Sequence, residues 1–191
     1  MKTVKITAHV VKTDLPKPGE RFKWKGIPFI ALGMEQGGLL AITEKPTADM
    51  AFDEDGKNDW RSSSLREYLN GEWLENLGKD GLLPFTSDLT ADDGLKDYGT
   101  AEDYVFLLSA DLYRKYRSYI PKQKEWWWLL TPWTCLPSSA YYVRVVYTDG
   151  SLYSNCAGGA LGVVAGLLFN PEIPAWRESA ATAARSAEES A

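Results

Sequence analysis

In the C-terminal third of this sequence, four side chains could act as nucleophiles or bases: Cys135, Ser138, Ser139 and Asp149. A nucleophile needs a base within hydrogen-bond reach, and none of the four has a histidine or lysine at a recognisable motif spacing. His9 is the only histidine, so the chain offers no histidine cluster for zinc and no histidine-dependent triad. We therefore expect no catalytic residue and no enzymatic activity.

Two acidic loops, residues 53–59 and 88–97, are dense enough in carboxylates to hold a cation. An EF-hand loop counted from Asp53 would need its closing glutamate at position 64, which is a serine. The loops are better interpreted as solvated turns, with a calcium requirement left as an alternative. The glycine-rich GGALGVVAG reads as a tight turn and a buried strand rather than a phosphate loop. We expect neither a metal site nor a cofactor.

The charge and hydropathy patterns exclude two classes of partner. The 191-residue chain has a net charge of -5 and no long basic run, which argues against a nucleic-acid groove. No stretch reaches the roughly 18 apolar residues of a membrane span, and residues 1–20 lack the apolar core of a signal peptide. We expect a soluble protein that neither binds nucleic acid nor inserts into a membrane. Its two cysteines, Cys135 and Cys156, are expected to be free thiols.

The N-terminal part of the sequence reads as β-structure. Residues 3–11 alternate and are rich in β-branched side chains, which predicts a strand that ends at LPKPGE. Residues 21–45 predict two further strands joined by a turn at Glu35–Gly38, so that a β-meander forms. We expect its inner face to carry six apolar side chains: Phe22, Trp24, Phe29, Leu32, Leu40 and Ile42.

Two helices are predicted in the middle of the chain. The first has apolar residues at helical spacing between Leu65 and Leu77, and Gly71 should interrupt it. One of the serines at 62–64 is expected to cap it, with Glu67 completing a capping box three residues after Ser64. The run YVFLLS predicts a short strand, a second helix should begin near Asp111, and the C-terminal third should be mostly β.

Residues 125–133, EWWWLLTPW, hold four of the eight tryptophans. In a strand, Trp126 and Trp128 would share one face and Trp127 the other, and at least one face must pack in the core. Core packing does not account for the aromatic residues that follow among Ser, Thr, Asn and Gly. Tyr and Trp supply contact area at low entropy cost, and small polar residues supply adaptable hydrogen bonds. We interpret this strip as a binding face: Trp133, Tyr141, Tyr142, Tyr147 and Tyr153.

Five motifs occur in an order that resembles a domain family of Gram-positive gut bacteria and their phages. They are DWRSSSLREYLN, EDYVFLLSADLYRKY, WWWLLTP, VVYTDGSL and LGVVAGLLFN, and the resemblance spans about residues 17–172. The family pattern is W-x-x-S-x-L-R-x-W-L-N, D-x-V-F-L-L-S, W-W-L-R-[ST]-P, a D-G turn and G-V-R-P-A-L. Leu130 stands where the family has Arg, and Val164-Ala165-Gly166 where it has Arg-Pro-Ala. We expect an apolar pairing to replace the contacts of those arginines.

The resemblance implies an α+β, C-type-lectin-like fold of small antiparallel sheets with two helices over residues 1–176. An Ala/Ser/Glu-rich tail, helical or disordered, would follow at 177–191. This fold is shared with formylglycine-generating enzymes and with the variable proteins of diversity-generating retroelements, in which a WW strand supports an exposed hypervariable ligand site. Trp127 and Trp128 would then be scaffold. The implied ligand-binding positions are Trp133, Cys135, Leu136, Tyr141, Tyr142, Arg144, Val146, Tyr147, Tyr153, Asn155 and Cys156.

The resemblance also implies a function without catalysis. The chain would be a receptor-binding domain of a phage tail tip or a surface adhesin, encoded by a phage or prophage. Its partner would be a protein or glycan receptor on a cell surface, and it would form a homo-oligomer such as a trimer. Two alternatives stay open: a structural or assembly module of a phage tail, and an enzyme of formylglycine-generating or carbohydrate-active type. Cys135 and Cys156 do not convincingly reproduce the cysteine pair of that enzyme branch.

Overall fold

The computed structural model describes residues 15–172, so the predicted strand at 3–11, His9 and the tail at 177–191 lie outside the described residues. Residues 21–45, predicted to hold two strands, hold three: β1 (Arg21–Trp24), β2 (Ile27–Glu35) and β3 (Gly38–Thr43). A turn at Lys25 and Gly26, both with positive φ, separates β1 from β2, and the three strands form an antiparallel meander. Glu35 pairs with Gly38, which confirms the predicted turn. Gln36 and Gly37 between them have φ of 44° and 83°, as a tight hairpin turn requires at both central residues.

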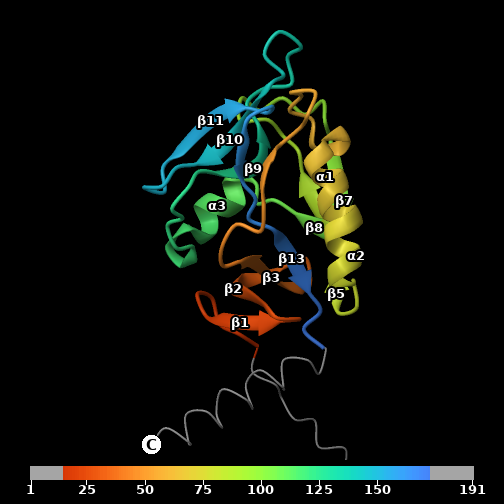
Figure 1. Ribbon diagram of the computed structural model, residues 1–191, viewed down its shortest axis with the longest axis vertical. Coiled ribbons are helices and arrows are strands. Elements are labelled where there is room, and N and C mark those ends of the chain that lie inside the picture. Colours follow the sequence, from red (N-terminus) through yellow and green to blue (C-terminus); the bar gives the residue numbers. More distant parts are fainter. Residues whose placement is uncertain (1–14, 173–191) are drawn as a thin grey trace, which may run out of the picture.

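Two sheets form most of the molecule, which is a mixed α+β structure (Figure 1). The six-stranded sheet has the order β1-β2-β3-β13-β5, and β8 also pairs with β13; these strands are β13 (Gly166–Phe169), β5 (Leu82–Leu83) and β8 (Val105–Phe106). The five-stranded sheet has the order β11-β10-β9-β12-β4. Its strands are β11 (Leu152–Cys156), β10 (Tyr142–Val146), β9 (Trp127–Pro132), β12 (Ala160–Gly162) and β4 (Asp49–Ala51).

The remaining strands, β6 (Phe85–Asp88) and β7 (Thr100–Asp103), form a separate antiparallel pair. Strand pairing is antiparallel throughout the described residues except between β12 and β9, which run parallel. Residues 126–172 consist of strands and loops, so the described part of the C-terminal third is β-structure, as predicted. None of the described helices has the length and apolar character needed to cross a membrane.

The first predicted helix is present and is interrupted where expected. It consists of α1 (Ser64–Tyr68), a π-helical turn (Leu69–Trp73) and α2 (Leu74–Leu77), and Gly71 has non-helical φ and ψ of -99° and -107°. Short 3-10 helices at Trp60–Ser62 and Arg117–Tyr119 lie beside the longer helices. The second predicted helix is α3 (Ala110–Tyr116).

The predicted capping box at Ser64 and Glu67 is wrong. Ser63 is the N-cap, and its hydroxyl accepts a hydrogen bond from the backbone N–H of Arg66 at 3.2 Å. Because Arg66 is the residue three positions after this cap, Glu67 falls outside the box position. Capping of α3 follows the same rule, since the Ser109 hydroxyl accepts from the N–H of Leu112.

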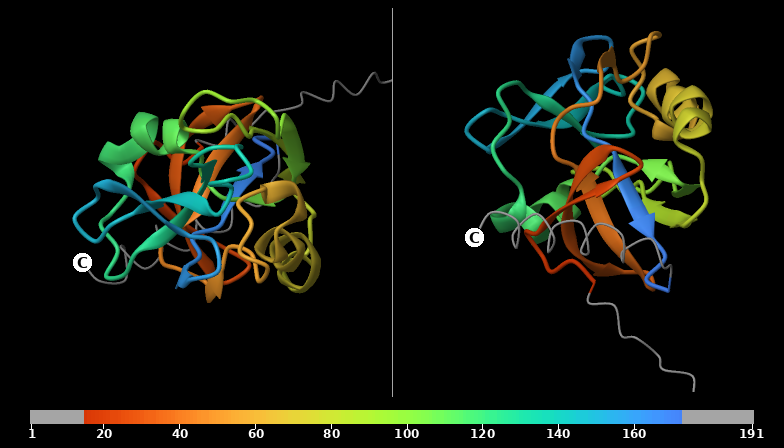
Figure 2. Two further views of the ribbon diagram at one scale, coloured as in Figure 1. Left: turned by 90° about the horizontal axis from the view of Figure 1, so that it is seen from above. Right: turned by 60° about the horizontal axis from the view of Figure 1, so that its bottom comes forward.

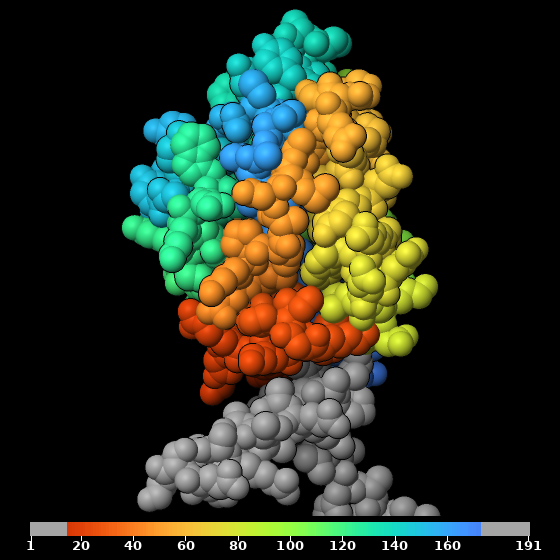
Figure 3. Space-filling model, in the orientation of Figure 1, coloured from red at the N-terminus to blue at the C-terminus, as the bar shows by residue number. Residues whose placement is uncertain are grey.

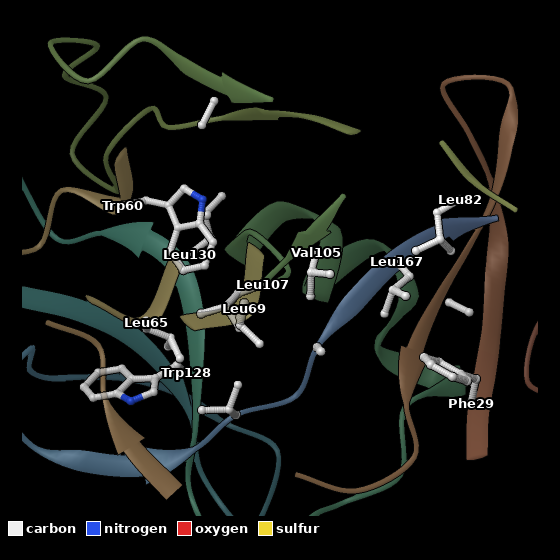
Figure 4. Close-up of a cluster of buried hydrophobic side chains, with 14 of the residues drawn as sticks. Phe29, Trp60, Leu65, Leu69, Leu82, Val105, Leu107, Trp128, Leu130 and Leu167 are labelled. Carbon is white, nitrogen blue, oxygen red and sulfur yellow. The ribbon is translucent and has the colours of Figure 1, made fainter. Parts of the chain in front are cut away.

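The core consists of two clusters, and six strands, β2, β3, β8, β9, β10 and β13, contribute to both. Alternate residues of β3 point to opposite sides: Leu39 and Ala41 pack in the first cluster, Leu40 and Ile42 in the second. Both sides of β3 are buried, so the prediction of one inner face for the meander is wrong. The first cluster, part of which Figure 4 shows, holds Phe22, Trp24 and Phe29, whereas Leu32, Leu40 and Ile42 belong to the second.

Candidate functional site

The two tryptophans expected to be scaffold form the buried centre of the five-stranded sheet. Trp127 is 1% exposed and packs edge-on against Tyr113 of α3 in the second cluster. Trp128 is fully buried in the first cluster, and its indole Nε1–H donates to the Met50 carbonyl of β4 at 2.9 Å. β9 therefore connects both halves of the core, as its alternation predicts. Both tryptophans are scaffold residues, as predicted.

The two positions at which the resembled pattern has arginine are apolar core positions in this chain. Leu130 and Ala165 pack in the first cluster, and Val164 packs in the second. Leu130 is 1% exposed, and its backbone N–H donates to the Leu108 carbonyl at 2.9 Å. Buried apolar side chains therefore fill the core at Leu130 and at Val164.

The eleven predicted ligand-binding positions differ widely in exposure. Ten have accessible surface, but Val146 is 2% exposed and packs in the second core cluster, so the prediction that it contacts a ligand is wrong. Strict alternation along β10 would place the Val146 side chain on the same face as Arg144. Val146 instead packs in the core cluster that also contains Tyr113 and Tyr116 of α3. The half-buried positions are Cys135, Tyr142, Arg144, Tyr147 and Asn155, and the exposed ones are Trp133, Leu136, Tyr141, Tyr153 and Cys156.

An aromatic row lies on one face of this sheet. Trp126, just before β9, stacks on Tyr147, just after β10, with ring centroids 3.7 Å apart. Tyr147 in turn contacts Tyr153 of β11 at 4.3 Å between centroids, and Tyr153 is 52% exposed. The outer end of the row therefore presents aromatic surface to solvent. We call Trp126, Tyr147 and Tyr153 the aromatic row.

A shallow cleft opens beside the Trp126 end of the aromatic row. It has a volume of about 330 Å³ and lies between β4, β12 and the turn after β10. Its lining combines carboxylates, a lysine and a hydroxyl with apolar surface: Asp49, Lys124, Glu125, Trp126, Thr148, Ala160 and Leu161. Groups of both kinds are available to a ligand that extends past the row.

Arg144 organises the opposite face of β10. Its Nη1 donates to the Ser154 hydroxyl at 3.0 Å, and its guanidinium lies 5.5 Å from the centre of the Trp133 ring. Asp92 balances the charge, with its Oδ1 3.8 Å from Arg144 Nε and 3.3 Å from Arg114 Nη2. The Arg144 side chain is only 13% exposed, whereas the Trp133 ring is 45% exposed. The cation–π contact of the guanidinium therefore supports the inner side of the exposed ring.

The loop at residues 133–141 carries three of the exposed apolar side chains, Trp133, Leu136 and Tyr141. Asn58 holds both ends of this loop, because its side-chain Nδ2 donates to the carbonyls of Thr134 and Tyr142, each at 2.9 Å. Its backbone N–H also donates to the Ala140 carbonyl at 3.2 Å. Asn58 is fully buried, so the loop is anchored rather than free along the surface.

Three loops far apart in the sequence meet at this end of the molecule (Figure 3). They are residues 53–58, 133–141 and 157–159. The Asp53 N–H donates to the Ala157 carbonyl at 3.1 Å, and the Ala157 N–H donates to the Tyr141 carbonyl at 2.8 Å. β1 and the end of β13 lie at the opposite end, so the described chain enters and leaves far from this surface (Figures 1 and 2). We call the three loops the loop pole.

The acidic loops use their carboxylates internally. Asp53 is 6% exposed, and its carboxylate accepts from the N–H groups of Lys57 and Ser64. In the second loop, Asp88 accepts from Thr90 and Asp93 from the N–H of Leu95. Within residues 15–172, no group of three or more His, Cys, Asp and Glu side chains is placed to hold a metal ion.

The two cysteines are free thiols in different surroundings. Cys156 is exposed on β11, whereas Cys135 is half-buried and its Sγ lies 4.0 Å from the Leu95 carbonyl. Burial raises the pKa of the Cys135 thiol, so it stays protonated near neutral pH. Burial, with the nearby Cys135 and Asp59, also raises the pKa of Tyr98 to about 12, and its hydroxyl donates to Asn58 Oδ1 at 2.8 Å.

Two parts of the site were missed by the sequence reasoning. Trp126 belongs to the aromatic row, although only its alternation with Trp128 was considered. Asn58 looked like one polar residue of a turn, and nothing in its local pattern distinguishes it from Asn70, which bonds to the backbone of Val105 instead. Only the tertiary arrangement reveals which loop each amide holds.

The chain matches no protein-family model, no curated protein and no solved structure at a significant level. The site must therefore be interpreted from its own geometry.

Proposed function

We propose that this chain is a non-enzymatic ligand-binding domain whose binding surface consists of the aromatic row and the loop 133–141. One observation carries the proposal. Four of the six exposed large apolar side chains among the described residues lie between positions 133 and 153, at Trp133, Leu136, Tyr141 and Tyr153. The four come from one sheet and its loop, with Tyr153 in the aromatic row and Trp133 over Arg144 on the other face of β10. Such a concentration of exposed apolar side chains in one segment favours a contact surface.

The surface combines fixed support with tolerance of substitution. Trp127, Trp128 and Asn58 are buried, and the side chains of Trp128 and Asn58 are hydrogen-bonded, whereas Trp133, Leu136, Tyr141 and Tyr153 are exposed. Such a division suits the C-type-lectin-like variable proteins that the five motifs resemble, and we include in the proposal that this strip is diversified. An exposed thiol at Cys156 and an exposed apolar side chain at Leu136 support that reading.

The position of the surface favours a partner outside the molecule. The loop pole lies opposite the end at which the described chain enters and leaves, so a carrier attached there would present the loops outward (Figure 1). We propose a receptor-binding role of the kind found at a phage tail tip or on an adhesin, with a protein or glycan receptor on a cell surface. Tyr and Trp at the centre with small polar residues around them suit either ligand.

Binding of the labelled full-length protein to a panel of intact Gram-positive gut bacteria tests this function. We expect Tyr153→Ala and Trp133→Ala each to weaken binding by about tenfold or more, because exposed aromatic anchors dominate such surfaces. Met34→Ala is the matched control, since Met34 is 51% exposed on β2, outside the strip. All three variants should melt near the wild-type temperature.

Absence of binding to every strain, or equal binding by all variants, would contradict the proposal. A wild-type protein that binds no cell but co-assembles with phage tail proteins through Trp133 and Tyr153 would instead support the assembly module.

A further inference from the structure

The outer edge of the five-stranded sheet is β11, which pairs on one side only, with β10. The N–H of Tyr147 donates to the Ser151 carbonyl at 2.9 Å, and that of Ala157 donates to the Tyr141 carbonyl at 2.8 Å. Bonded and non-bonded pairs alternate in an antiparallel ladder. These two bonds lie just beyond either end of β11, so the bonded residues within it are Tyr153 and Asn155.

The other three residues of β11 point their backbone groups away from β10. Leu152 and Ser154 each present an N–H and a C=O, and Cys156 presents its N–H, while the Cys156 carbonyl accepts from the N–H of Gly159 at 3.0 Å. No described residue bonds to the outward groups of Leu152 and Ser154. The ribbon views place β11 on the outside of the sheet, with no described element beyond it (Figures 1 and 2).

β11 also lacks the features that protect sheet edges from pairing. Such features are charged side chains, proline, bulges or very short length. β1 carries exposed Arg21 and Lys23, β4 has three residues and begins with the exposed Asp49, and β5 has only two residues. In contrast, β11 is the five-residue run LYSNC, without a charge or proline, and its register with β10 has no shift.

We propose that β11 is a self-association edge, which pairs antiparallel with β11 of a second copy about a two-fold axis at Ser154. Ser154 then faces Ser154 of the second copy, and Leu152 faces its Cys156. Each copy supplies the three outward N–H donors of Leu152, Ser154 and Cys156. The outward groups of one chain are thereby satisfied by those of the other, as in an ordinary ladder.

A second copy suits this edge better than an unrelated peptide because the edge is self-complementary. The two-fold axis places Ser154 opposite its own copy and the other residues of β11 within a few residues of theirs, so a charged residue in this strand would meet a like charge. β11 has none. On the face of the aromatic row, Tyr153 would lie beside Asn155 of the second copy. The two rows then extend one surface, which provides avidity for a repeated receptor.

Sedimentation of the full-length protein tests the pairing without any ligand. We expect a dimer for the wild type and a monomer for S154P, because proline removes an outward N–H and leaves the backbone bonds to β10 intact. S154A, which like S154P lacks the hydroxyl that Arg144 donates to but keeps the N–H, should remain a dimer. S154K should also give a monomer, since the two lysines would face each other across the axis. T148K is the matched control, because Thr148 lies in the turn outside β11 and the change adds the same charge.

Cross-linking tests the register. In a background with Cys135 and Cys156 changed to serine, S154C should form a disulfide-linked dimer, because directly opposed bonded residues have Cα atoms about 5.5 Å apart. The Cys135→Ser variant, which keeps Cys156 as its cysteine and Ser154 unchanged, is the control. In this register the two Cys156 residues lie roughly 13 Å apart along the strand and should not cross-link. A monomer, a trimer unaffected by S154P and S154K, or cross-linking through Cys156 in place of S154C would overturn the proposal. None of these results depends on whether the receptor-binding function is correct.

Discussion

The side-chain amide of Asn58 donates a 2.9 Å hydrogen bond to the backbone carbonyl of Tyr142, 84 residues away in the sequence. The same nitrogen donates to the Thr134 carbonyl, so one buried amide holds both ends of the loop that carries the exposed apolar side chains. Order at this surface thus depends on a residue from a distant loop. Rigid support lowers the entropy lost when a surface binds its ligand.

Removal of the Asn58 amide should destabilise the fold. In Asn58→Ala the Thr134 carbonyl loses its side-chain donor and the Tyr98 hydroxyl loses its acceptor. We expect the free energy of unfolding to fall by about 3 kcal/mol, because buried polar groups left unpaired are costly. Tyr98→Phe removes one of these bonds and should cost about 1 kcal/mol. Urea denaturation of both variants measures the difference, and equal stability of Asn58→Ala and the wild type would refute the role of Asn58.

Tryptophan fluorescence should separate the display surface from its scaffold. Trp133 is 45% exposed, whereas Trp127 and Trp128 are 1% and 0% exposed. We expect Trp133→Phe to remove a substantial part of the emission that iodide quenches, and Trp127→Phe to remove little of it. If iodide quenching were unchanged in Trp133→Phe, the ring would be covered, as in an assembly interface.

Stability should fall in acid partly through Glu35. Burial raises the pKa of this carboxyl, but hydrogen bonds from Lys115 and Tyr116 lower it by more, so its net pKa lies below the ordinary 4.5. A depressed carboxylate pKa gives stability that is full above the unfolded value and is lost as pH falls through the folded value. Glu35→Gln should therefore cost about 1 kcal/mol at neutral pH and less at an acid pH below the folded pKa of Glu35.

The matched control for Glu35 is Glu102→Gln on β7, because Glu102 is exposed. Urea denaturation at both pH values compares the two variants with the wild type. A loss of stability in Glu35→Gln that is the same at both pH values would show that packing, rather than the charge, is responsible.

The two thiols should react at different rates. Cys156 is exposed, while burial limits access to Cys135 and raises its pKa. Near neutral pH we expect a chromogenic thiol reagent to modify Cys156 about tenfold faster or more, because the thiolate is the reactive form. Cys156→Ser should leave only the slow phase. A fast phase that persists in this variant would contradict the arrangement of the loop 133–141.

Local pattern was sufficient for the elements and for part of the site. Alternation in the run of tryptophans predicts that Trp127 and Trp128 lie on opposite faces, and both are buried. The helical spacing from Leu65 to Leu77 and the break at Gly71 are likewise local, as is the turn between β2 and β3. The C-type-lectin-like identity of the arrangement stays a proposal.

Tertiary packing decided what local pattern could not. Val146 alternates like a surface residue, yet it is 2% exposed and belongs to the core cluster that also holds Tyr113 and Tyr116 of α3. β3 is covered on both faces. Its six residues are all small or apolar, so no alternation of polar and apolar side chains shows which face is buried. Asn58 and Trp126 acquire their roles from contacts with residues 134–147, and sequence separation conceals such contacts.

The most direct test of the central claim is natural variation at the encoding locus in many isolates. A displayed surface on a fixed frame predicts substitutions concentrated at exposed positions such as Trp133, Leu136, Tyr141, Tyr153 and Cys156, with Asn58, Trp127 and Trp128 unchanged. A nearby reverse transcriptase gene and a second copy of the 3′ end that differs mainly at adenines should accompany this pattern. An invariant strip without the second copy would contradict the diversified surface and leave a fixed interface above the tryptophan core.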